Sequence, residues 1–371
     1  MALRRVVGTS LLVVSLIGCH QATEHQVSPA DTYSADLAAI IAGSLPTIPL
    51  PPWPAGDQRG MANTLGTGTW LRCAYHLSQP NARLYDLSFA RSNDMPQSPW
   101  GPPLKLEYGP TAGVPGTIHA WHPGVMVVGE PGAQGTQMDA FGHWGYLPEP
   151  WDGSGEFPAD DVRYYGGFTQ TDVKPSPDSP LMKLGIEQVP PIITSAVLLD
   201  ARTHLGGGTP MQAGQQVTAA NLEQMIESQG LGWRGLLPGD VVYIYTGWSD
   251  YWNEDFYYDK GPGLSYDGAR YLEDKRVVLV ALDNPFTDAV NEGQFFEGAE
   301  PPDGTPPDMS TPVHHHNLTQ AGIHNIQNAN LGKLAKDQVW LSCTMIVPLS
   351  VQGGSGSPIR PIAVGTRTVP P

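Results

Sequence analysis

Cysteine and positive charge are both scarce in this sequence. Only three cysteines occur among 371 residues and no Cys-x-x-Cys pair is present, which argues against a zinc site built from thiolates. Lys and Arg number 20 against 36 Asp and Glu, and the net charge of −16 would repel phosphate backbones and anionic lipid. We therefore expect no nucleic-acid partner. With 40% hydrophobic and 15% charged residues, the chain is still typical of a globular protein.

Long apolar runs are also missing, and no stretch after residue 18 could cross a bilayer. One shorter run, residues 6–17, follows two arginines and precedes Gly18-Cys19, a pattern typical of a secretory signal. Residues 16–19, Leu-Ile-Gly-Cys, resemble a bacterial lipobox, in which the Cys becomes the lipidated first residue. We predict a signal peptide over residues 1–18, lipidation at Cys19, and export to the bacterial cell envelope with the lipid as the only membrane anchor. An ordinary signal peptide with a chance Cys is the alternative.

The remaining cysteines, Cys73 and Cys343, can pair in an oxidising compartment, but the sequence does not show that they meet. Residues 19–52 are polar and then Pro-rich, which predicts a tether that becomes an extended arm. The folded body is expected over residues 53–371.

Patterns typical of strands and helices alternate in the body, which predicts an α/β fold. Compact β-branched or apolar runs predict strands over residues 196–201, 241–246, 276–282 and 339–347. Capping and helical spacing predict helices over residues 218–227 and 269–273, and residues 318–335 show a broken helical spacing.

The segment that suggests chemistry is Gly135-Thr-Gln-Met-Asp-Ala-Phe-Gly-His143, where Asp139 and His143 lie four apart. A carboxylate and an imidazole can together bind a divalent ion and move a proton. Gly135, Thr136, Asp139 and His143 fall in register with the motif His-x-Gly-Thr-His-x-Asp-x-Pro-x-His of the cyclase family, the kynurenine-formamidase-like metal-dependent hydrolases. The similarity continues, in family order, over about residues 53–365. The blocks that carry it are Trp53–Asn63, Tyr85–Ser88, Leu198–Asp200, Gly239–Trp248, Gly263–Leu264, Asp283–Asn284, Gly322–Ile323 and Gly353–Pro361.

The resemblance implies an α/β domain with a mixed β-sheet or flattened barrel and flanking helices. It also implies a hydrolase of a small cyclic or aromatic amide, of the arylformamidase type that serves tryptophan catabolism. One or two ions, zinc or manganese, would activate water, and Asp139 would hold the ion while His143 acts as acid and base. Relatives are commonly oligomeric, so we expect a homo-oligomer with a small-molecule substrate.

Several positions depart from the family's motif. The first ligand position holds Ala133, which cannot bind an ion, and the second holds Gln137, a weaker donor than imidazole for zinc. The downstream carboxylate position holds Gln327, and the downstream imidazole is best aligned with His315 in His314-His-His316.

Three further side chains have less defined roles. His119 and His122 could substitute for the missing ligands, but ordinary loop positions are the favoured interpretation. Trp248 is assigned to substrate binding, with a core position as the alternative.

Two rival functions follow from the altered motif. One is a lipid-tethered protein that binds a small molecule and has lost the ion. The other is a metal-free lyase or isomerase that uses His143 and Asp139 as a base pair.

Overall fold

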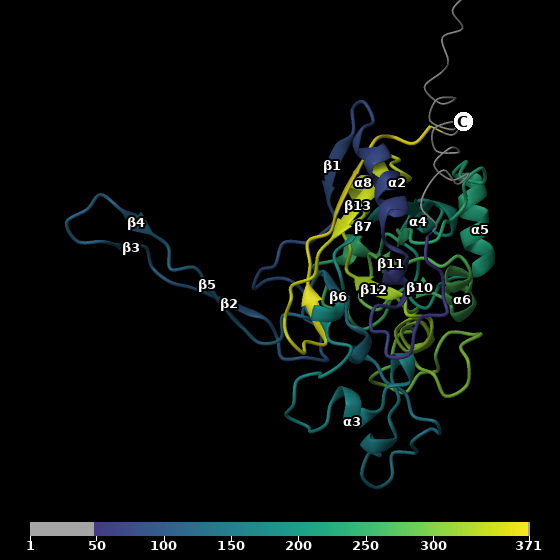
Figure 1. Cartoon of the computed structure of the whole chain (residues 1–371), viewed down its shortest axis with the longest axis horizontal. Coiled ribbons are helices and arrows are strands. Elements are labelled where there is room, and N and C mark those ends of the chain that lie inside the picture. The colour runs from purple at the N-terminus through teal and green to yellow at the C-terminus, as the bar shows by residue number, and fades with distance from the viewer. Residues whose placement is uncertain (1–47, 370–371) are drawn as a thin grey trace, which may run out of the picture.

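The computed structural model describes residues 48–369, so the predicted signal peptide and Cys19 lie outside the described residues. The centre of the fold is a curled nine-stranded mixed sheet (Figure 1). Its strands, in spatial order, are β1 (Arg83–Asp86), β15 (Ile362–Gly365), β13 (Leu341–Ile346), β7 (Ile192–Leu199), β9 (Val241–Ile244), β11 (Leu279–Leu282), β12 (His324–Gln327), β6 (Gln137–Asp139) and β14 (Gly356–Pro358). The predicted α/β fold with a mixed sheet is confirmed.

Four central strands run parallel, in the order β7, β9, β11 and β12, and the other neighbours are antiparallel. Strands β9 and β11 are buried along their whole length. They are covered on both faces, and this explains why their sequences are continuous Val, Ile and Leu runs without polar alternation.

Helices cover the sheet. They are α2 (Thr67–Leu77), α3 (Gln170–Val173), α4 (Ala201–His204), α5 (Ala219–Ser228), α6 (Tyr266–Asp274), α7 (Pro312–His315), α8 (Gly332–Lys336) and the π-helix η7 (His316–Ala321). Short 3₁₀ turns are η1 (Gly60–Thr64), η2 (Phe141–His143), η3 (Ala159–Asp161), η4 (Tyr165–Gly167), η5 (Ile186–Gln188) and η6 (Trp248–Tyr251). Helix α2 packs on β7, β13 and β15, while α5 and α6 pack side by side. No helix within residues 48–369 is long and apolar enough to span a membrane.

Most predicted elements are present with shifted ends. Helix α5 begins after Thr218, whose hydroxyl accepts a hydrogen bond from the backbone of Asn221, as its capping pattern predicts. Residues 318–335 do not form the interrupted helix that their spacing suggests, because β12 runs through the middle of this segment. Its residues His324–Gln327 are all buried between β11 and β6.

A disulfide and a buried ion pair also stabilise the fold. A disulfide joins Cys73 in α2 to Cys343 in β13, so the pairing that the sequence left open does form. Nearby, the buried Arg234 guanidinium makes two hydrogen bonds, of 2.7 and 2.8 Å, to the Asp240 carboxylate at the start of β9. These contacts tie the N-terminal helix and the loop before β9 to the sheet.

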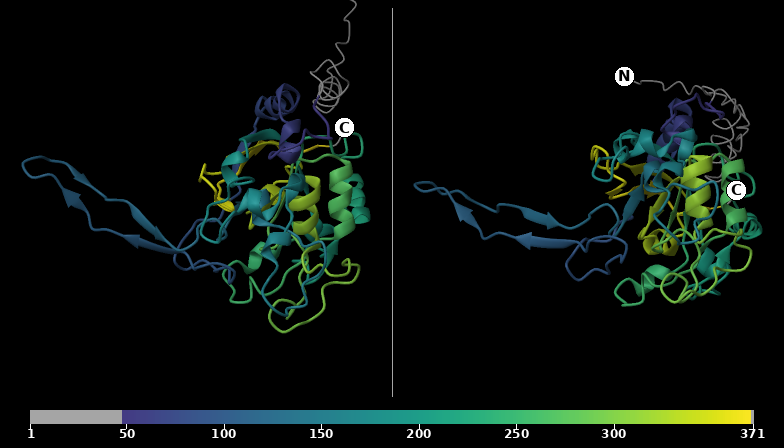
Figure 2. Two further views of the ribbon diagram at one scale, coloured as in Figure 1. Left: turned by 60° about the horizontal axis from the view of Figure 1, so that its bottom comes forward. Right: turned by 90° about the horizontal axis from the view of Figure 1, so that it is seen from below.

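Three small ribbons complete the strands. They are β8 (Gln216–Val217) with β10 (Gly263–Leu264), β2 (Lys105–Tyr108) with β5 (Val125–Val128), and β3 (Ala112–Gly113) with β4 (Ala120–Trp121). The last two ribbons form one long hairpin that projects from the body, on the side opposite α5 and α6 (Figures 1 and 2).

Candidate active site

The candidate site is built on the antiparallel pair β6 and β12. Gln137 in β6 lies directly opposite Gln327 in β12, and Asp139 follows two residues after Gln137, so it faces the same side. The Gln327 side-chain amide donates a 2.6 Å hydrogen bond to Asp139 Oδ2. All three side chains are buried. The structure therefore brings together the three candidate ligands that come from the two strands.

The register of these strands is fixed by the two residues before Gln137. Gly135 has a φ of 68°, which favours glycine, and its carbonyl accepts a hydrogen bond from the Asn328 amide. The Thr136 hydroxyl donates to the Asn328 carbonyl at 2.7 Å and accepts from the backbone of Phe89. The hydrogen bonds of Gly135 and Thr136 to Asn328 thus hold Gln327 opposite Gln137.

His314 completes the site from above β12. Its Nδ1 lies 2.6 Å from Asp288 Oδ2, and its Nε2 lies 3.5 Å from Asp139 Oδ2. The same Asp288 carboxylate accepts the backbone N–H groups of Val313 and His314, so it also orients the start of α7. Burial alone would lower the pKa of His314, but hydrogen bonds and charge from Asp139 and Asp288 raise it to about 10.

The sequence aligns the downstream imidazole best with His315, but the structure places His314 beside Asp139. Successive residues of a helix point about 100° apart, so only one member of the triple His can face the site. The His315 ring instead meets Tyr146 edge-on at 5.4 Å, and its Nε2 lies 2.9 Å from the Gln320 amide. The carboxylate of Asp288, which sequence reasoning missed, decides which of the three turns inward.

His143 stands at the open side of the site. It ends the turn η2 and is exposed, in contrast to the buried residues around Asp139. Burial would raise the pKa of Asp139, but the charge of His143, together with His314 and Gln327, lowers it. Asp139 is therefore a buried carboxylate anion with an exposed imidazole beside it.

Other predicted residues lie elsewhere. Trp248, which the sequence assigns to substrate binding with a core position as the alternative, is only 3% exposed and packs in a cluster with Trp252 and Tyr257. The large apolar indole of Trp248 belongs to the core, where its N–H donates to the Tyr257 carbonyl. His119 and His122 are exposed on the projecting hairpin, which agrees with their interpretation as loop residues.

A groove of about 930 Å³ lies next to the site. Trp144 forms part of its wall, and the same ring stands 5.2 Å from the His314 ring. The aromatic residues Tyr146, Trp151, Phe157 and Tyr164 also line it, with His315 on the facing segment. This volume and apolar lining are in the range of small-molecule pockets.

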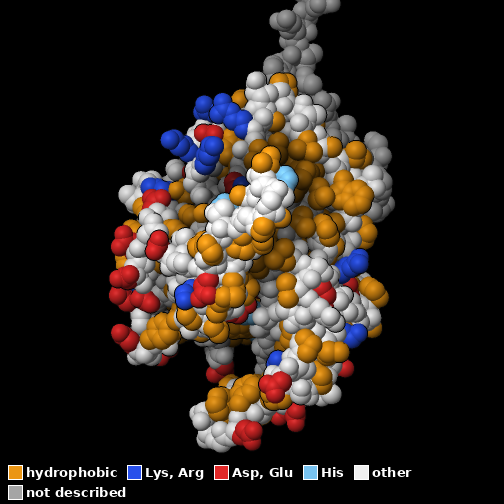
Figure 3. Space-filling model, turned by 90° about the vertical axis from the view of Figure 1, so that its left-hand side faces the viewer, with side chains coloured by type: hydrophobic (Ala, Val, Ile, Leu, Met, Phe, Trp, Pro, Cys, Tyr) orange, Lys and Arg blue, Asp and Glu red, His pale blue; other side chains and the backbone are white. Residues whose placement is uncertain are grey.

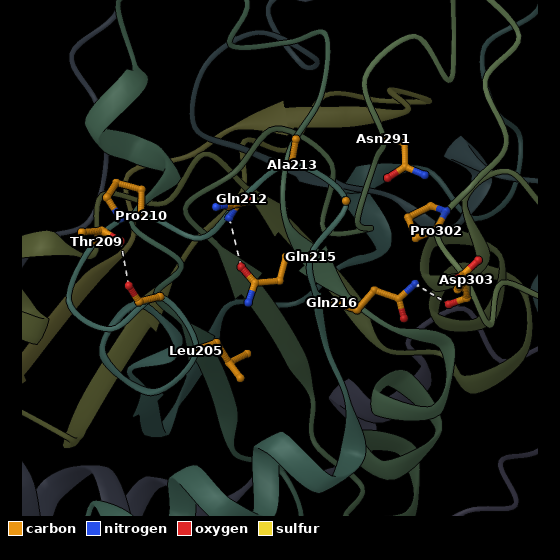
Figure 4. Close-up of a pocket in the computed structure, with 12 residues that line it drawn as sticks. Leu205, Thr209, Pro210, Gln212, Ala213, Gln215, Gln216, Asn291, Pro302 and Asp303 are labelled. Atoms are coloured by element: carbon orange, nitrogen blue, oxygen red, sulfur yellow. Dashed lines mark hydrogen bonds between the residues drawn. The ribbon is translucent and has the colours of Figure 1, made fainter.

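A second hollow of about 650 Å³ lies among the loops around residues 205–216 and 291–303 (Figure 4). Its polar side chains are mainly amides and a hydroxyl, and several of these are bonded to the loop itself, as Gln216 is to the Asp303 carbonyl. Asp303 is its one carboxylate, and no imidazole lines it. It offers no acid and base pair, so the chemistry is assigned to the Asp139 site.

The family's motif implies a bound ion at Asp139. No three His, Cys, Asp or Glu side chains gather around an ion position within residues 48–369. However, the buried Oε1 atoms of Gln137 and Gln327 have no hydrogen-bond partner in this part of the chain. An unpaired buried carbonyl oxygen costs about 1–3 kcal/mol. These oxygens, with Asp139 and His314, are the donors that this site could offer to an ion that prefers oxygen ligands.

Comparison with known proteins identifies the family of the chain. The family model named Cyclase matches residues 85–289. The chain belongs to the Cyclase family. No curated protein matches the sequence.

Solved structures share the fold of this Cyclase-family chain. A structure described as a novel cyclase is 24% identical, covers 84% of this chain and 95% of its own, and has a TM-score of 0.68. Isatin hydrolase A from Ralstonia solanacearum is 20% identical over 78% of this chain and 95% of its own, with a TM-score of 0.50. An isatin hydrolase bound to the product analogue thioisatinate is 19% identical over 76% of this chain and 92% of its own, with a TM-score of 0.51. At these identities, the similarity shows the fold.

Proposed function

We propose that this Cyclase-family protein is a hydrolase that cleaves a small cyclic or aromatic amide, with one divalent ion at Asp139. The observation that carries the proposal is the buried Asp139 carboxylate beside His314 and the Gln327 amide, on strands where the buried Oε1 atoms of Gln137 and Gln327 have no partner among the described residues. Asp139, Gln137, Gln327 and His314 would hold the ion. When bound, such an ion polarises a carbonyl and lowers the pKa of water.

The protein's own side chains supply orientation and proton transfer. Asp288 accepts the Nδ1–H of His314, which leaves Nε2 directed to Asp139, an arrangement commonly found behind imidazole ligands. His143 is exposed and close to Asp139, so it can exchange protons with a substrate that enters from solvent. A general acid and base of this kind contributes about 10²–10⁴-fold in rate.

The groove beside the site supports an aromatic substrate. Trp144 contacts both the groove and the His314 ring, so an amide carbonyl at Asp139 would place its ring substituent against Trp151 and Phe157. These two side chains are 44% and 47% exposed and meet edge-on, which leaves ring faces available for stacking. An N-formyl aromatic amine and an aromatic lactam such as isatin are therefore the first substrates to assay.

The test is hydrolysis of these two amides by the purified chain in the presence of Mn²⁺. Asp139→Asn should abolish both ion binding and turnover, whereas His143→Gln should keep the ion and lose at least about 100-fold in turnover. His122→Gln, an exposed histidine on the hairpin, is the matched control and should change neither. Loss of ion binding in neither site variant would show that the site is misplaced.

Ion loss during evolution is the rival explanation, and the neutral side chains of Ala133, Gln137 and Gln327 favour it. Under that alternative the chain binds a small molecule in the same groove without turnover. Metal content after reconstitution with Mn²⁺ or Zn²⁺ separates the two. Less than about a tenth of an equivalent of either ion would overturn the hydrolase proposal, because structural and catalytic ions bind near stoichiometrically.

A further inference from the structure

The groove beside Asp139 has aromatic walls and very little charge in its lining. Its aromatic residues are Trp144, Tyr146, Trp151, Phe157 and Tyr164. Among the described residues that line it, Asp308 is the one with a formal charge, and no Lys or Arg is present. Lys and Arg are the side chains that most often pair a carboxylate. A carboxylate on a bound molecule would lose hydration here without gaining a partner. The lining therefore indicates that the groove selects ligands by charge.

The imidazoles near the groove do not supply the missing cation. His314 lies 2.6 Å from the Asp288 carboxylate and 3.5 Å from that of Asp139, so a charge on its ring is balanced within the site. The amide nitrogen of Gln320 lies 2.9 Å from His315 Nε2, so this ring nitrogen accepts a hydrogen bond and carries no proton. His315 therefore lines the groove as a neutral ring.

Two rings of the groove stand at right angles to each other. The centroids of Trp151 and Phe157 are 5.4 Å apart, with an angle of 83° between the ring planes. The indole N–H of Trp151 donates a 2.9 Å hydrogen bond to the Ser154 carbonyl, which fixes the indole within its own loop. The faces of such rings attract cations, and at an exposed site this strengthens binding by about two- to fivefold.

The loop that fixes Trp151 also holds a carboxylate next to it. Asp152 Oδ1 accepts hydrogen bonds from the backbone N–H of Ser154 at 2.8 Å and from its hydroxyl at 2.6 Å. These hydrogen bonds lower the pKa of Asp152, so it is an anion at neutral pH. One turn of the chain thus positions an aromatic ring and a negative charge side by side.

The surroundings of the groove are acidic as well. Residues 144–164, which supply most of one wall, contain five acidic residues and one basic residue. The acidic side chains are all exposed and are Glu149, Asp152, Glu156, Asp160 and Asp161. The basic residue, Arg163, donates from Nη1 to the carbonyls of Asp160 and Val162 in its own loop.

This acidic segment leads into α3 at the bottom of Figure 1, and Figure 3 shows more acidic than basic side chains over the lower half of the face that it draws. A hollow surrounded by charge of one sign raises the local concentration of ligands of the opposite sign. The groove should therefore attract cations and repel anions before any contact forms.

We propose that the groove takes an aromatic amide whose ring carries a protonated amine, and that it binds amides with a ring carboxylate least tightly. This inference rests on the proposed hydrolase for the position of the amide carbonyl at Asp139. The rings of Trp151 and Phe157 would bind the arene and the cation, and Asp308 with the acidic loop would set the preference for positive charge.

Three ketones test the preference without turnover, because they present a carbonyl beside the ring but have no carbon–nitrogen bond to cleave. They are acetophenone, its 4-aminomethyl derivative and its 4-carboxy derivative. Calorimetric titration of the purified chain at pH 7.5 should give an aminomethyl ligand at least about fivefold tighter than the parent, and a carboxy ligand at least about fivefold weaker. In 0.5 M NaCl the spread should narrow, because salt screens the exposed acidic side chains.

Two variants locate the preference in the groove. Trp151→Ala should weaken the aminomethyl ligand by about three- to tenfold, since a ring face is lost. Trp121→Ala on the projecting hairpin, where the indole is 52% exposed, is its matched control and should change nothing. Asp308→Asn should reduce the preference for the cation by about twofold, as expected for one exposed charge. Asp255→Asn, also exposed but outside the groove lining, is the control for it.

Circular dichroism checks that each variant is folded, and the ligand series on the wild type needs no variant at all. A carboxy ligand that binds as tightly as the parent would overturn the inference, and so would a charge preference that Trp151→Ala leaves intact. Hydrolysis of the three matching formanilides is measured separately. Turnover without the charge order would keep the proposed function and overturn this inference, whereas the charge order without turnover would support the inference and overturn the hydrolase.

Discussion

The side-chain amide of Gln327 donates a 2.6 Å hydrogen bond to the Asp139 carboxylate, across 188 residues of sequence. The family's motif places a carboxylate where Gln327 stands. Two carboxylates at this distance would repel each other unless a cation lay between them. Gln327 therefore satisfies the Asp139 carboxylate with a hydrogen bond inside the protein. As a neutral side chain, it also leaves the site with less negative charge to attract an ion.

Gln327→Glu should tighten binding of Mn²⁺ by at least about tenfold, because a second buried carboxylate attracts the ion more strongly than an amide does. Calorimetric titration with Mn²⁺ measures the change in dissociation constant. In the absence of the ion, the same variant should melt at a lower temperature, since the two carboxylates then repel each other. Gln224→Glu, at an exposed position on α5, is the control. An unchanged dissociation constant in Gln327→Glu would mean that this residue does not face the ion.

Asp288 should act as a positioning residue for His314. Its carboxylate accepts the ring N–H of His314 and two backbone N–H groups at the start of α7. Asp288→Asn should cost about 10–100-fold in ion affinity or turnover, since the amide can present its NH₂ group to Nδ1 and favour the wrong tautomer.

The matched control for this substitution is Asp200→Asn. Asp200 also caps a four-residue helix, α4, through the N–H of Thr203, but it lies outside the site. Equal losses of ion affinity in both variants would indicate general destabilisation rather than positioning. The dissociation constant for Mn²⁺ and the melting temperature of each variant distinguish the two effects.

Much of the sheet could be predicted because the central strands are buried on both faces. Strand β9 is a continuous run of β-branched and aromatic residues, and no helical spacing competes with that pattern. Strand β12 was missed because its residues are mostly polar. His324, Asn325 and Gln327 are buried by tertiary contacts with β6 and β11, and short polar segments carry no periodic signal of burial. The sequence does not predict the projecting hairpin of β2 to β5 for a related reason, since its apolar residues have no partner nearby along the chain that would show a pattern of burial.

Only the site residues that lie together on one strand could be placed from the sequence. The spacing within β6 is enough to place Gln137 and Asp139 on one face. The choice between His314 and His315 depends on the rotation of α7, which Asp288 sets from a distant loop. Trp248 follows a strand end, as many binding residues do, but its burial is decided by packing with other aromatic rings.

Acid should destabilise the fold through His324, which stacks on Phe141 and is fully buried. Burial lowers the pKa of His324 from 6.5 to about 4. The unfolded chain therefore binds a proton at this histidine below about pH 6.5 while the folded chain stays neutral, so stability falls as the pH drops from about 6.5 toward 4. The loss is on the order of 2–3 kcal/mol.

His324→Gln should remove this part of the pH dependence, because the amide does not titrate. Urea unfolding at pH 7.5, 5.5 and 4.5 measures the pH dependence of the unfolding free energy, with His119→Gln on the projecting hairpin as the control. The slope of unfolding free energy against pH should be shallower in His324→Gln than in the wild type and the control. Parallel slopes in all three proteins would show that His324 protonates in the folded state without cost.

Lipid anchoring at Cys19 is a proposal from the sequence alone, and one substitution tests it. The lipobox cysteine carries the acyl chains, and each buried CH₂ contributes about 0.8 kcal/mol to membrane binding. Cys19→Ser should therefore move the protein out of the membrane fraction of the producing bacterium, whereas Cys73→Ser should leave it there. Mass spectrometry of the mature N-terminus should show a diacyl or triacyl adduct in the wild type. A wild-type protein that is exported but free of membranes, with a cleaved and unmodified N-terminus, would instead establish an ordinary signal peptide.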